Sequence, residues 1–276
     1  MKCFPQLYIL DTQPKREVKN IGEAGLKLTQ KELVFSAAYL GFSKIYGIKD
    51  DSAVLGDNEI KNEWNMVKDS LSGKKLLSEE LDGSVALEQD FVNVVSVCCE
   101  PDLFLSVLYN DENDIANYFL TRNAVMAMEP DHLEPNTFIL IPLKSRELLV
   151  ARIMNDLLGM SDFTSKDIKF IASEYDANEA MHSVNAENVF VKSMGFTGTG
   201  VMDFTECLSN GQKAFLYYQN VNKALSYEIR FIWDGSSLYV IRPQAGDSLK
   251  VEIVSMDRDS VYEYLTSLLV AQEELV

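Results

Sequence analysis

Two amphipathic helices in this sequence each follow a run of short strands. In both helices the apolar residues recur at i, i+3, i+4, i+7 and i+8, which places them on one helical face. These residues are Val150, Ile153, Met154, Leu157 and Leu158 in the stretch 145–158, and Val261, Tyr264, Leu265, Leu268 and Leu269 in the stretch 258–269. Each helix therefore has one side to bury against a sheet, and each is expected to close a structural unit.

The strands that precede the closing helices are short and rich in β-branched and aromatic residues. The turns WDGSS and PQAGDS are short enough for antiparallel hairpins. The predicted strands are 102–109, 122–128 and 137–143 before the first helix, and 213–221, 225–233, 237–243 and 248–254 before the second. The last pair in the first half is joined by the proline-containing turn EPDHLEPN. Both halves are thus predicted to contain an antiparallel sheet.

Each half also begins with what looks like a capped helix. Thr29 with Glu32 forms a capping-box pattern, and Leu28 with Leu33 is spaced for a hydrophobic staple. The motif recurs downstream, with Thr164 and Asp167 as the cap and Phe163 and Ile168 as the staple. The second copy predicts a helix whose apolar face carries Ile168, Ile171, Ala172 and Tyr175.

This order predicts an α+β protein with two quasi-symmetric halves, related by internal duplication, in which an antiparallel β-sheet is flanked by helices. The expected halves are an N-terminal α+β half, 1–160, and a C-terminal α+β half, 161–276. Gly159 is suited to end the first closing helix. No Pro/Gly-rich linker separates the halves, so we expect both to pack as one globular unit.

Charge and composition narrow the possible partners and the compartment. With 42 acidic against 25 basic residues the net charge is −17, which disfavours binding to phosphate backbones and hence to nucleic acid. No apolar run approaches the roughly 18 residues of a membrane span, and no signal peptide is evident. The four cysteines lack a CxxC spacing and are expected to be reduced and buried. The sequence predicts a soluble, cytoplasmic protein without membrane insertion.

The sequence contains no recognisable set of catalytic residues. The chain has only two histidines, His132 and His182, and neither has the paired ligand spacing of a zinc site or the surroundings of a known nucleophile. The glycine-rich stretch 194–203 lacks the Gly-Lys-Ser/Thr of a phosphate loop, and the acidic stretch 110–114 lacks a full set of calcium ligands. We therefore expect that the protein is not an enzyme and that it has no catalytic residues, no cofactor and no metal site. Acid–base catalysis by a pair of carboxylates remains an alternative, because only the fold determines whether two carboxylates lie close together.

One segment stands out as a candidate partner-binding site. Residues 110–123 connect two predicted strands where the second half has only the WDGSS turn, and they carry Ile115, Tyr118, Phe119 and Leu120. Large apolar residues on an exposed loop are typical binding anchors. The alternative is a short helix that folds back on its own sheet.

Four stretches together resemble the EspG family of type VII (ESX) secretion chaperones, and more closely a divergent branch from low-GC Gram-positive bacteria. They are LTQKELVFSAAYLGFSKIYGI (28–48), EPDLFLSVLY (100–109), the block AVMAM to IMNDLL (124–158) and the closing block EIRF to TSLL (228–269). The resemblance implies an EspG-like α+β fold and a cytoplasmic, non-enzymatic chaperone or adaptor that binds a helical secreted protein and guides its export.

The resemblance also implies where a partner binds. In mycobacterial members a strand-to-strand loop of the first half and the C-terminal helices contact the cargo. The matching positions are the 110–123 segment, with Ile115, Tyr118, Phe119 and Leu120, and the 257–269 helix, with Tyr262 and Thr266. The implied partners are the helical targeting region of an LXG-type effector or a small WXG100-like helical protein. The acidic charge leaves a second hypothesis, an immunity protein that neutralises a secreted toxin.

Overall fold

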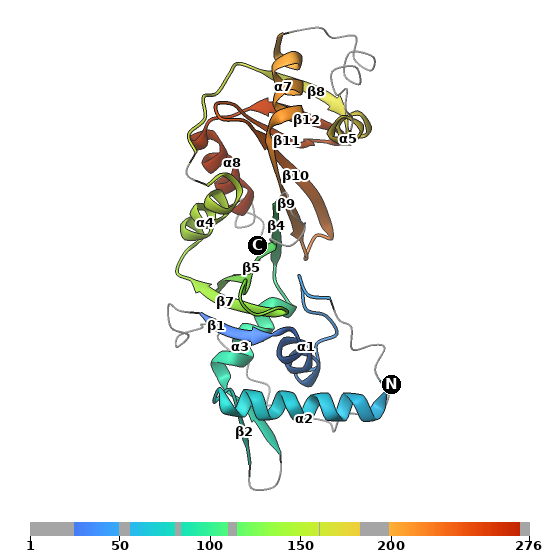
Figure 1. Cartoon of the computed structure of the whole chain (residues 1–276), viewed down its shortest axis with the longest axis vertical. Helices are drawn as coiled ribbons and strands as arrows, with labels where there is room; N and C mark the ends of the chain where they lie inside the picture. Colours follow the sequence, from blue (N-terminus) through green and yellow to red (C-terminus); the bar gives the residue numbers. More distant parts are fainter. Residues whose placement is uncertain are drawn as a thin grey trace. The chain divides into compact units, whose positions relative to one another are not determined.

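The computed structural model describes residues 25–49, 56–80, 84–109, 115–159, 161–182 and 199–270 (Figure 1). They form two compact units. Unit 1 runs to Phe104 and includes Asn117–Lys144, whereas unit 2 comprises Leu105–Ala116 and the chain from Ser145 onward. The closing helix of 146–158, expected in the first half, thus belongs to unit 2. Cys3 and residues 110–114 and 194–198 lie outside the described ranges.

Unit 1 is a four-stranded antiparallel sheet with helices on one face. Its sheet has the order β1-β7-β6-β5, and β6 and β7 are joined by the predicted turn that follows Pro130. Buried side chains of α1, α2 and α3 form one core with strand residues such as Leu28, Phe119 and Leu140. The elements are β1 (Leu26–Thr29), α1 (Gln30–Tyr39), α2 (Asp57–Gly73), β2 (Leu77–Glu79), β3 (Val85–Leu87), α3 (Gln89–Cys99), β5 (Ile115–Leu120), β6 (Val125–Pro130) and β7 (Thr137–Leu143).

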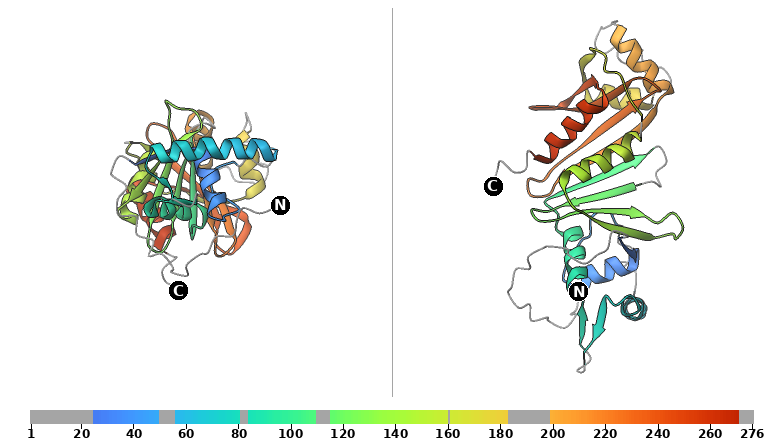
Figure 2. Two further views of the ribbon diagram at one scale, coloured as in Figure 1. Left: turned by 90° about the horizontal axis from the view of Figure 1, so that it is seen from below. Right: turned by 90° about the vertical axis from the view of Figure 1, so that its left-hand side faces the viewer.

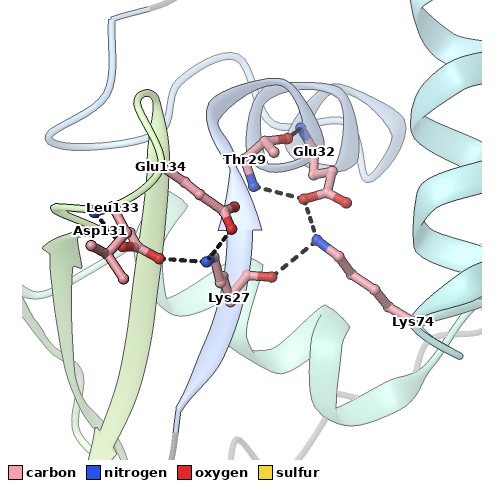
Figure 3. A network of polar contacts seen from close by, with 7 residues as sticks. All are labelled: Lys27, Thr29, Glu32, Lys74, Asp131, Leu133 and Glu134. Atoms are coloured by element: carbon pink, nitrogen blue, oxygen red, sulfur yellow. Dashed lines mark hydrogen bonds and ion pairs between the residues drawn. The ribbon is translucent and has the colours of Figure 1, made fainter.

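The predicted capping box of the first helix is confirmed. The Glu32 amide donates to Thr29 Oγ1 at 3.2 Å, and the Thr29 amide donates to Glu32 Oε2 at 2.6 Å. Leu28 and Leu33 are fully buried in the same core, as the staple requires. Figure 3 shows that Lys74, the C-cap residue of α2, also donates to Glu32 Oε2; the distance is 2.7 Å. The cap therefore fixes both the start of α1 and the position of α2.

Unit 2 is an antiparallel sheet covered on both faces. The strand order β4-β9-β10-β11-β12-β8 contains the predicted meander of four strands. Residues of α5 and α7 share a core with Ile232, Tyr239 and Ile253 on one face. On the opposite face Arg242 lies against Tyr264 of α8. The elements are β4 (Leu103–Tyr109), α4 (Arg146–Leu158), β8 (Lys169–Ser173), α5 (Glu174–His182), α7 (Thr199–Asn210), β9 (Gln212–Asn220), β10 (Leu225–Trp233), β11 (Leu238–Gln244), β12 (Asp247–Ser255) and α8 (Arg258–Val270).

The two closing helices lie side by side in unit 2. At one end Arg146 of α4 donates to the Leu269 carbonyl of α8 at 3.5 Å, and at the other Arg258 of α8 donates to the Gly159 carbonyl at 2.8 Å. Gly159 has a φ of 59°, the left-handed conformation in which glycine ends helices. All five apolar residues predicted for the face of α4 are buried, as are Val261, Leu265 and Leu269 of α8. The predicted amphipathic faces are thus confirmed.

The predicted second capping box is wrong. Residues 163–168 are not helical: the Thr164 amide donates to the Ser236 carbonyl at 3.1 Å, and the Lys166 amide donates to Ser255 Oγ at 3.0 Å. Ile171 and Ala172 then lie in β8, and the helix begins only at Glu174. The cap is Ser173, whose Oγ accepts from the Asp176 amide at 3.0 Å. Hydrogen bonds to the neighbouring turn and strand therefore outweigh the local helical pattern.

The expected α+β architecture with antiparallel sheet and flanking helices is confirmed. Both β1 and β8 lead into a capped helix, and each pairs antiparallel with the last strand of its own meander, β1 with β7 and β8 with β12. Each meander is followed by a closing helix, α4 or α8. Among the described elements, a strand, helices, a four-stranded meander and a closing helix thus follow one another twice, and only the first half also has the β2–β3 hairpin. An origin by duplication stays a prediction.

Candidate functional site: a groove in unit 2

The candidate site is a groove of about 1070 Å³ in unit 2. Its walls come from the start of β10, the hairpin of β11 and β12, the first residue of α5 and the half-buried Tyr264 and Leu268 of α8. The lining residues are Glu174, Leu225, Ser226, Tyr227, Glu228, Arg242, Pro243, Gln244, Ala245, Gly246, Asp247, Lys250, Val251, Glu252, Tyr264 and Leu268. The turn of the β11–β12 hairpin requires Gly246, which has a φ of 83°.

One wall is an ion-pair cluster on an aromatic ring. Arg242 donates from Nε and Nη2 to Glu252 Oε2, at 2.8 and 2.6 Å, and Lys169 also pairs with Glu252. The guanidinium lies over the Tyr264 ring, 4.7 Å from its centroid, a favourable cation–π arrangement. Burial raises the pKa of Tyr264 to about 12. These contacts hold α8 against the sheet.

The protonation of Glu252 follows from the same contacts. Burial alone would raise the pKa of this carboxyl, but the hydrogen bonds from Lys169 and Arg242 outweigh it and the pKa is lowered. Glu252 is thus ionised at neutral pH and acts as an acceptor, not as a proton donor. Its negative charge is balanced by Arg242 and Lys169.

The opposite wall is held by a buried arginine. Arg230 of β10 is 6% exposed and donates to Glu228 at 2.7 Å and to Glu174 of α5. Both carboxylates line the groove. Arg230 Nη1 and the Oε1 of Gln244, also a lining residue, are buried and have no hydrogen-bond partner among the described residues. Buried polar atoms of this kind normally have partners.

The prediction of an exposed loop is wrong for Ile115–Leu120. Ile115 begins β5, an ordinary strand that pairs with β6 from Asn117↔Met128 to Leu120↔Val125. Tyr118 and Phe119 are fully buried and Leu120 is 3% exposed. These apolar side chains fill the sheet's own core, which explains their clustering without any partner. The alternative of a short helix is also wrong.

The two predicted positions on the last helix, α8, do not line the groove. Tyr262 is 39% exposed on α8, and Thr266 is half-buried with an Oγ1 that has no partner among the described residues. The groove is instead lined by their neighbours Tyr264 and Leu268. A partner-binding role of Tyr262 and Thr266 stays a prediction.

Sequence reasoning missed Arg242, Glu252 and Tyr264 as a unit. Arg242 and Glu252 face each other across the β11–β12 pairing, as the antiparallel register requires. The available signal was opposite charge at cross-strand positions of a predicted hairpin. Across the described ranges, no group of three or more His, Cys, Asp or Glu side chains is placed to hold a metal ion.

Three of the four cysteines can be placed. Cys98, Cys99 and Cys207 are free and buried, as predicted. Burial raises the pKa of Cys99 and of Cys207 to about 12. These thiols are therefore protonated at neutral pH and pack as small apolar groups. No described helix is long and apolar enough to cross a membrane.

The fold is similar to that of a type VII secretion chaperone. It is similar to the Mycobacterium tuberculosis chaperone EspG5, known from a structure of its complex with the PE25–PPE41 dimer, with a TM-score of 0.60 and 11% sequence identity. The match covers 89% of this chain and 95% of the EspG5 chain. The sequence matches no protein-family model and no curated protein. The likeness is one of fold, over nearly the whole length of both chains.

Proposed function

We propose that this protein is a cytoplasmic chaperone or adaptor of a type VII secretion system. In this role it binds a helical secreted protein and guides its export, acting by binding and not by catalysis. The observation that carries the proposal is the match to EspG5 over 89% of the chain, because EspG5 was solved in complex with a PE–PPE dimer. The helical targeting region of an LXG-type effector or a small WXG100-like protein is the partner we propose.

The surface of unit 2 supports a binding role. The groove of about 1070 Å³ lies beside α8, the helix that the resemblance singled out. Tyr262 and Tyr175 are both exposed, at 39% and 74%, and aromatic side chains of this kind are frequent anchors in interfaces. Tyr262 is on α8 and Tyr175 is on α5. Comparing variants of these two residues therefore distinguishes binding at the last helix from a general effect of removing an exposed aromatic side chain.

The test is a binding measurement with purified full-length chain and type VII helical substrates, by calorimetry and size-exclusion chromatography. The proposal expects a stable complex with the helical targeting region and less aggregation of the substrate. Tyr262→Ala should raise the Kd about tenfold or more, the effect of losing an aromatic anchor, whereas Tyr175→Ala should not change it. If no helical substrate binds the wild-type chain, the proposal fails.

The net charge of −17 favours a second candidate, an immunity protein. An acidic surface accelerates association with a cationic toxin and covers it. The two functions predict binding to different parts of one effector: the chaperone binds the helical targeting part, and the immunity protein binds the toxic domain. Separate expression of the two parts in the same assay, with toxin activity as a second readout, decides between them.

A further inference from the structure

The sheet of unit 2 splits between two of its central strands. The pairing of β10 with β11 runs from Trp233↔Leu238 to Arg230↔Ile241 and stops there. The remaining part of β10, from Leu225 on, stays paired with β9, and the end of β11 stays paired with β12. Figure 2 shows the resulting separation of the two hairpins, with α8 close to both (right-hand view).

A proline explains why the ladder stops. The Asp234 amide donates to the Ser237 carbonyl at 3.1 Å, which fixes the alternation of hydrogen-bonded pairs along β10 and β11. Hydrogen-bonded pairs recur at every second residue of each strand. If the pairing continued, Glu228 would lie opposite Pro243 in such a pair. Proline has no N–H to donate, and the β11–β12 register shifts directly after it, between Pro243 and Gln244. The pairing therefore ends and the strands diverge.

The split leaves a strand edge that faces the groove. By the same alternation, the backbone groups of Ser226 and Glu228 point away from β9 and toward the gap. Leu225–Ile229 continue for five residues beyond the last pair with β11, a length of about 17 Å in an extended strand. Ser226, Tyr227 and Glu228 all line the groove of about 1070 Å³. The groove thus lies where the next strand of the sheet would run.

The charged side chains in the walls are already paired, so the edge is defined by its main chain. Four carboxylates line the groove: Glu174 and Glu228 pair with Arg230, Glu252 pairs with Arg242 and Lys169, and Asp247 pairs with Lys250. The backbone N–H and C=O groups of Ser226 and Glu228 that point toward the gap match a ligand that presents donors and acceptors at strand spacing, as an extended peptide backbone does.

We propose that an extended peptide segment of a protein partner binds in this groove by pairing as a strand with the free edge of β10. Main-chain hydrogen bonds to Ser226 and Glu228 give the affinity, and the side chains that alternate along the bound strand contact the walls of the groove. The inference goes beyond the proposed function, since that function concerns a helical partner. The extended segment binds here whether or not a helix binds elsewhere.

The first experiment uses the full-length chain and a synthetic probe, the acetylated and amidated peptide Thr-Lys-Val-Lys-Thr-Lys-Val. Binding is followed by fluorescence anisotropy, and amide hydrogen exchange of Ser226 and Glu228 by NMR. We expect exchange at both amides to slow at least tenfold with peptide. N-methylation of alternate residues, on the register that faces β10, should weaken binding at least tenfold, because it removes the peptide's own donors.

The second experiment restores the pairing between β10 and β11, so that the edge of β10 is no longer free. Pro243→Val restores an N–H, so the ladder should extend to the Glu228 pair; the Glu228 amide should then be protected without peptide, and peptide affinity should fall at least tenfold. Pro142→Val, in β7 of unit 1, is the matched strand-proline control and should leave binding unchanged. Thermal unfolding of each variant confirms that it is folded.

The possible results separate the inference from its competitors. Peptide binding that leaves Ser226 and Glu228 exchange unchanged, or that survives Pro243→Val at full strength, overturns it. Protection of these amides that rises with protein concentration in the absence of peptide would show that a second copy of the chain occupies the edge, and also overturns it. A failure to bind any helical substrate would refute only the proposed function, because the probe peptide needs no such partner.

Discussion

Replacement of Glu32 by glutamine should destabilise unit 1 by about 2 kcal/mol. Glu32 is 1% exposed and accepts three hydrogen bonds, from the Thr29 amide at 2.6 Å, Lys74 Nζ at 2.7 Å and Ser70 Oγ at 2.8 Å. A hydrogen bond to a charged group contributes about 1.5–3 kcal/mol. Glutamine keeps the shape and one acceptor oxygen but loses the charge that Lys74 requires. Lys74 is 35% exposed and can turn to water, which keeps the cost near the lower end.

The assay is urea unfolding followed by the fluorescence of Trp64. This residue stacks on Tyr39 of α1 with ring centroids 5.3 Å apart, so it reports on the helix that Glu32 caps. A Trp233→Phe background removes the signal of unit 2. The control is Glu134→Gln, which removes a carboxylate that is 59% exposed and paired with Lys27 in the same network (Figure 3); it should leave stability unchanged.

The pH dependence is a second, independent check on Glu32. Burial alone would raise its pKa, but the bonds from Lys74, Thr29 and Ser70 outweigh burial and lower it below the ordinary 4.5. A carboxylate with a depressed pKa stabilises the folded state fully above its unfolded value and loses this contribution as pH falls through the folded value. The difference between wild type and Glu32→Gln should be constant at neutral pH and shrink below pH 4.5. A difference under about 0.5 kcal/mol at neutral pH would refute the assigned role.

Two further predictions concern unit 2. Gly211→Ala should destabilise it by about 2 kcal/mol or more, because the new Cβ would lie 2.4 Å from the Trp233 carbonyl oxygen and backbone must shift; Gly235→Ala, where nothing lies within 4 Å, is the control in the same denaturation assay. The pKa of Tyr264 is raised by burial from 10.0 to about 12, so its stabilising contribution should be complete below pH 10 and lost as pH rises through 12. Absorbance at 295 nm and circular dichroism along the titration measure this, and a Tyr264 that ionises near pH 10 in the folded protein would contradict it.

The meander strands and closing helices could be predicted because their patterns are long. Strands such as Leu225–Trp233 contain enough β-branched and aromatic residues to outweigh a helical alternative, and the face of Arg146–Leu158 repeats over three turns. For these elements local preference and burial agree. Their positions in the structure differ from the predicted ones by only a few residues.

Short elements and the edge of the sheet could not be predicted in this way. Lys169–Ser173 spans five residues, and Ile168, Ile171 and Ala172 also have helical spacing, so only pairing with β12 decides for a strand. The sequence predicts an exposed loop for Ile115–Leu120 because the corresponding connection in the second half is a tight turn, WDGSS. Burial of Tyr118 and Phe119 depends on contacts distant in sequence, which no local pattern contains.

The groove shows how a single residue can decide a site that local patterns miss. Pro243 lies in a run otherwise typical of a strand, and such a proline is expected at an edge or bulge. In the structure β11 is an interior strand, so the edge that Pro243 requires arises within the sheet, where β10 and β11 separate. The signal was present in the letters RPQAG. Its meaning depended on the strand order, which only the structure supplies: Pro243 pairs with β12 but not with β10, and this leaves a free edge beside Glu228.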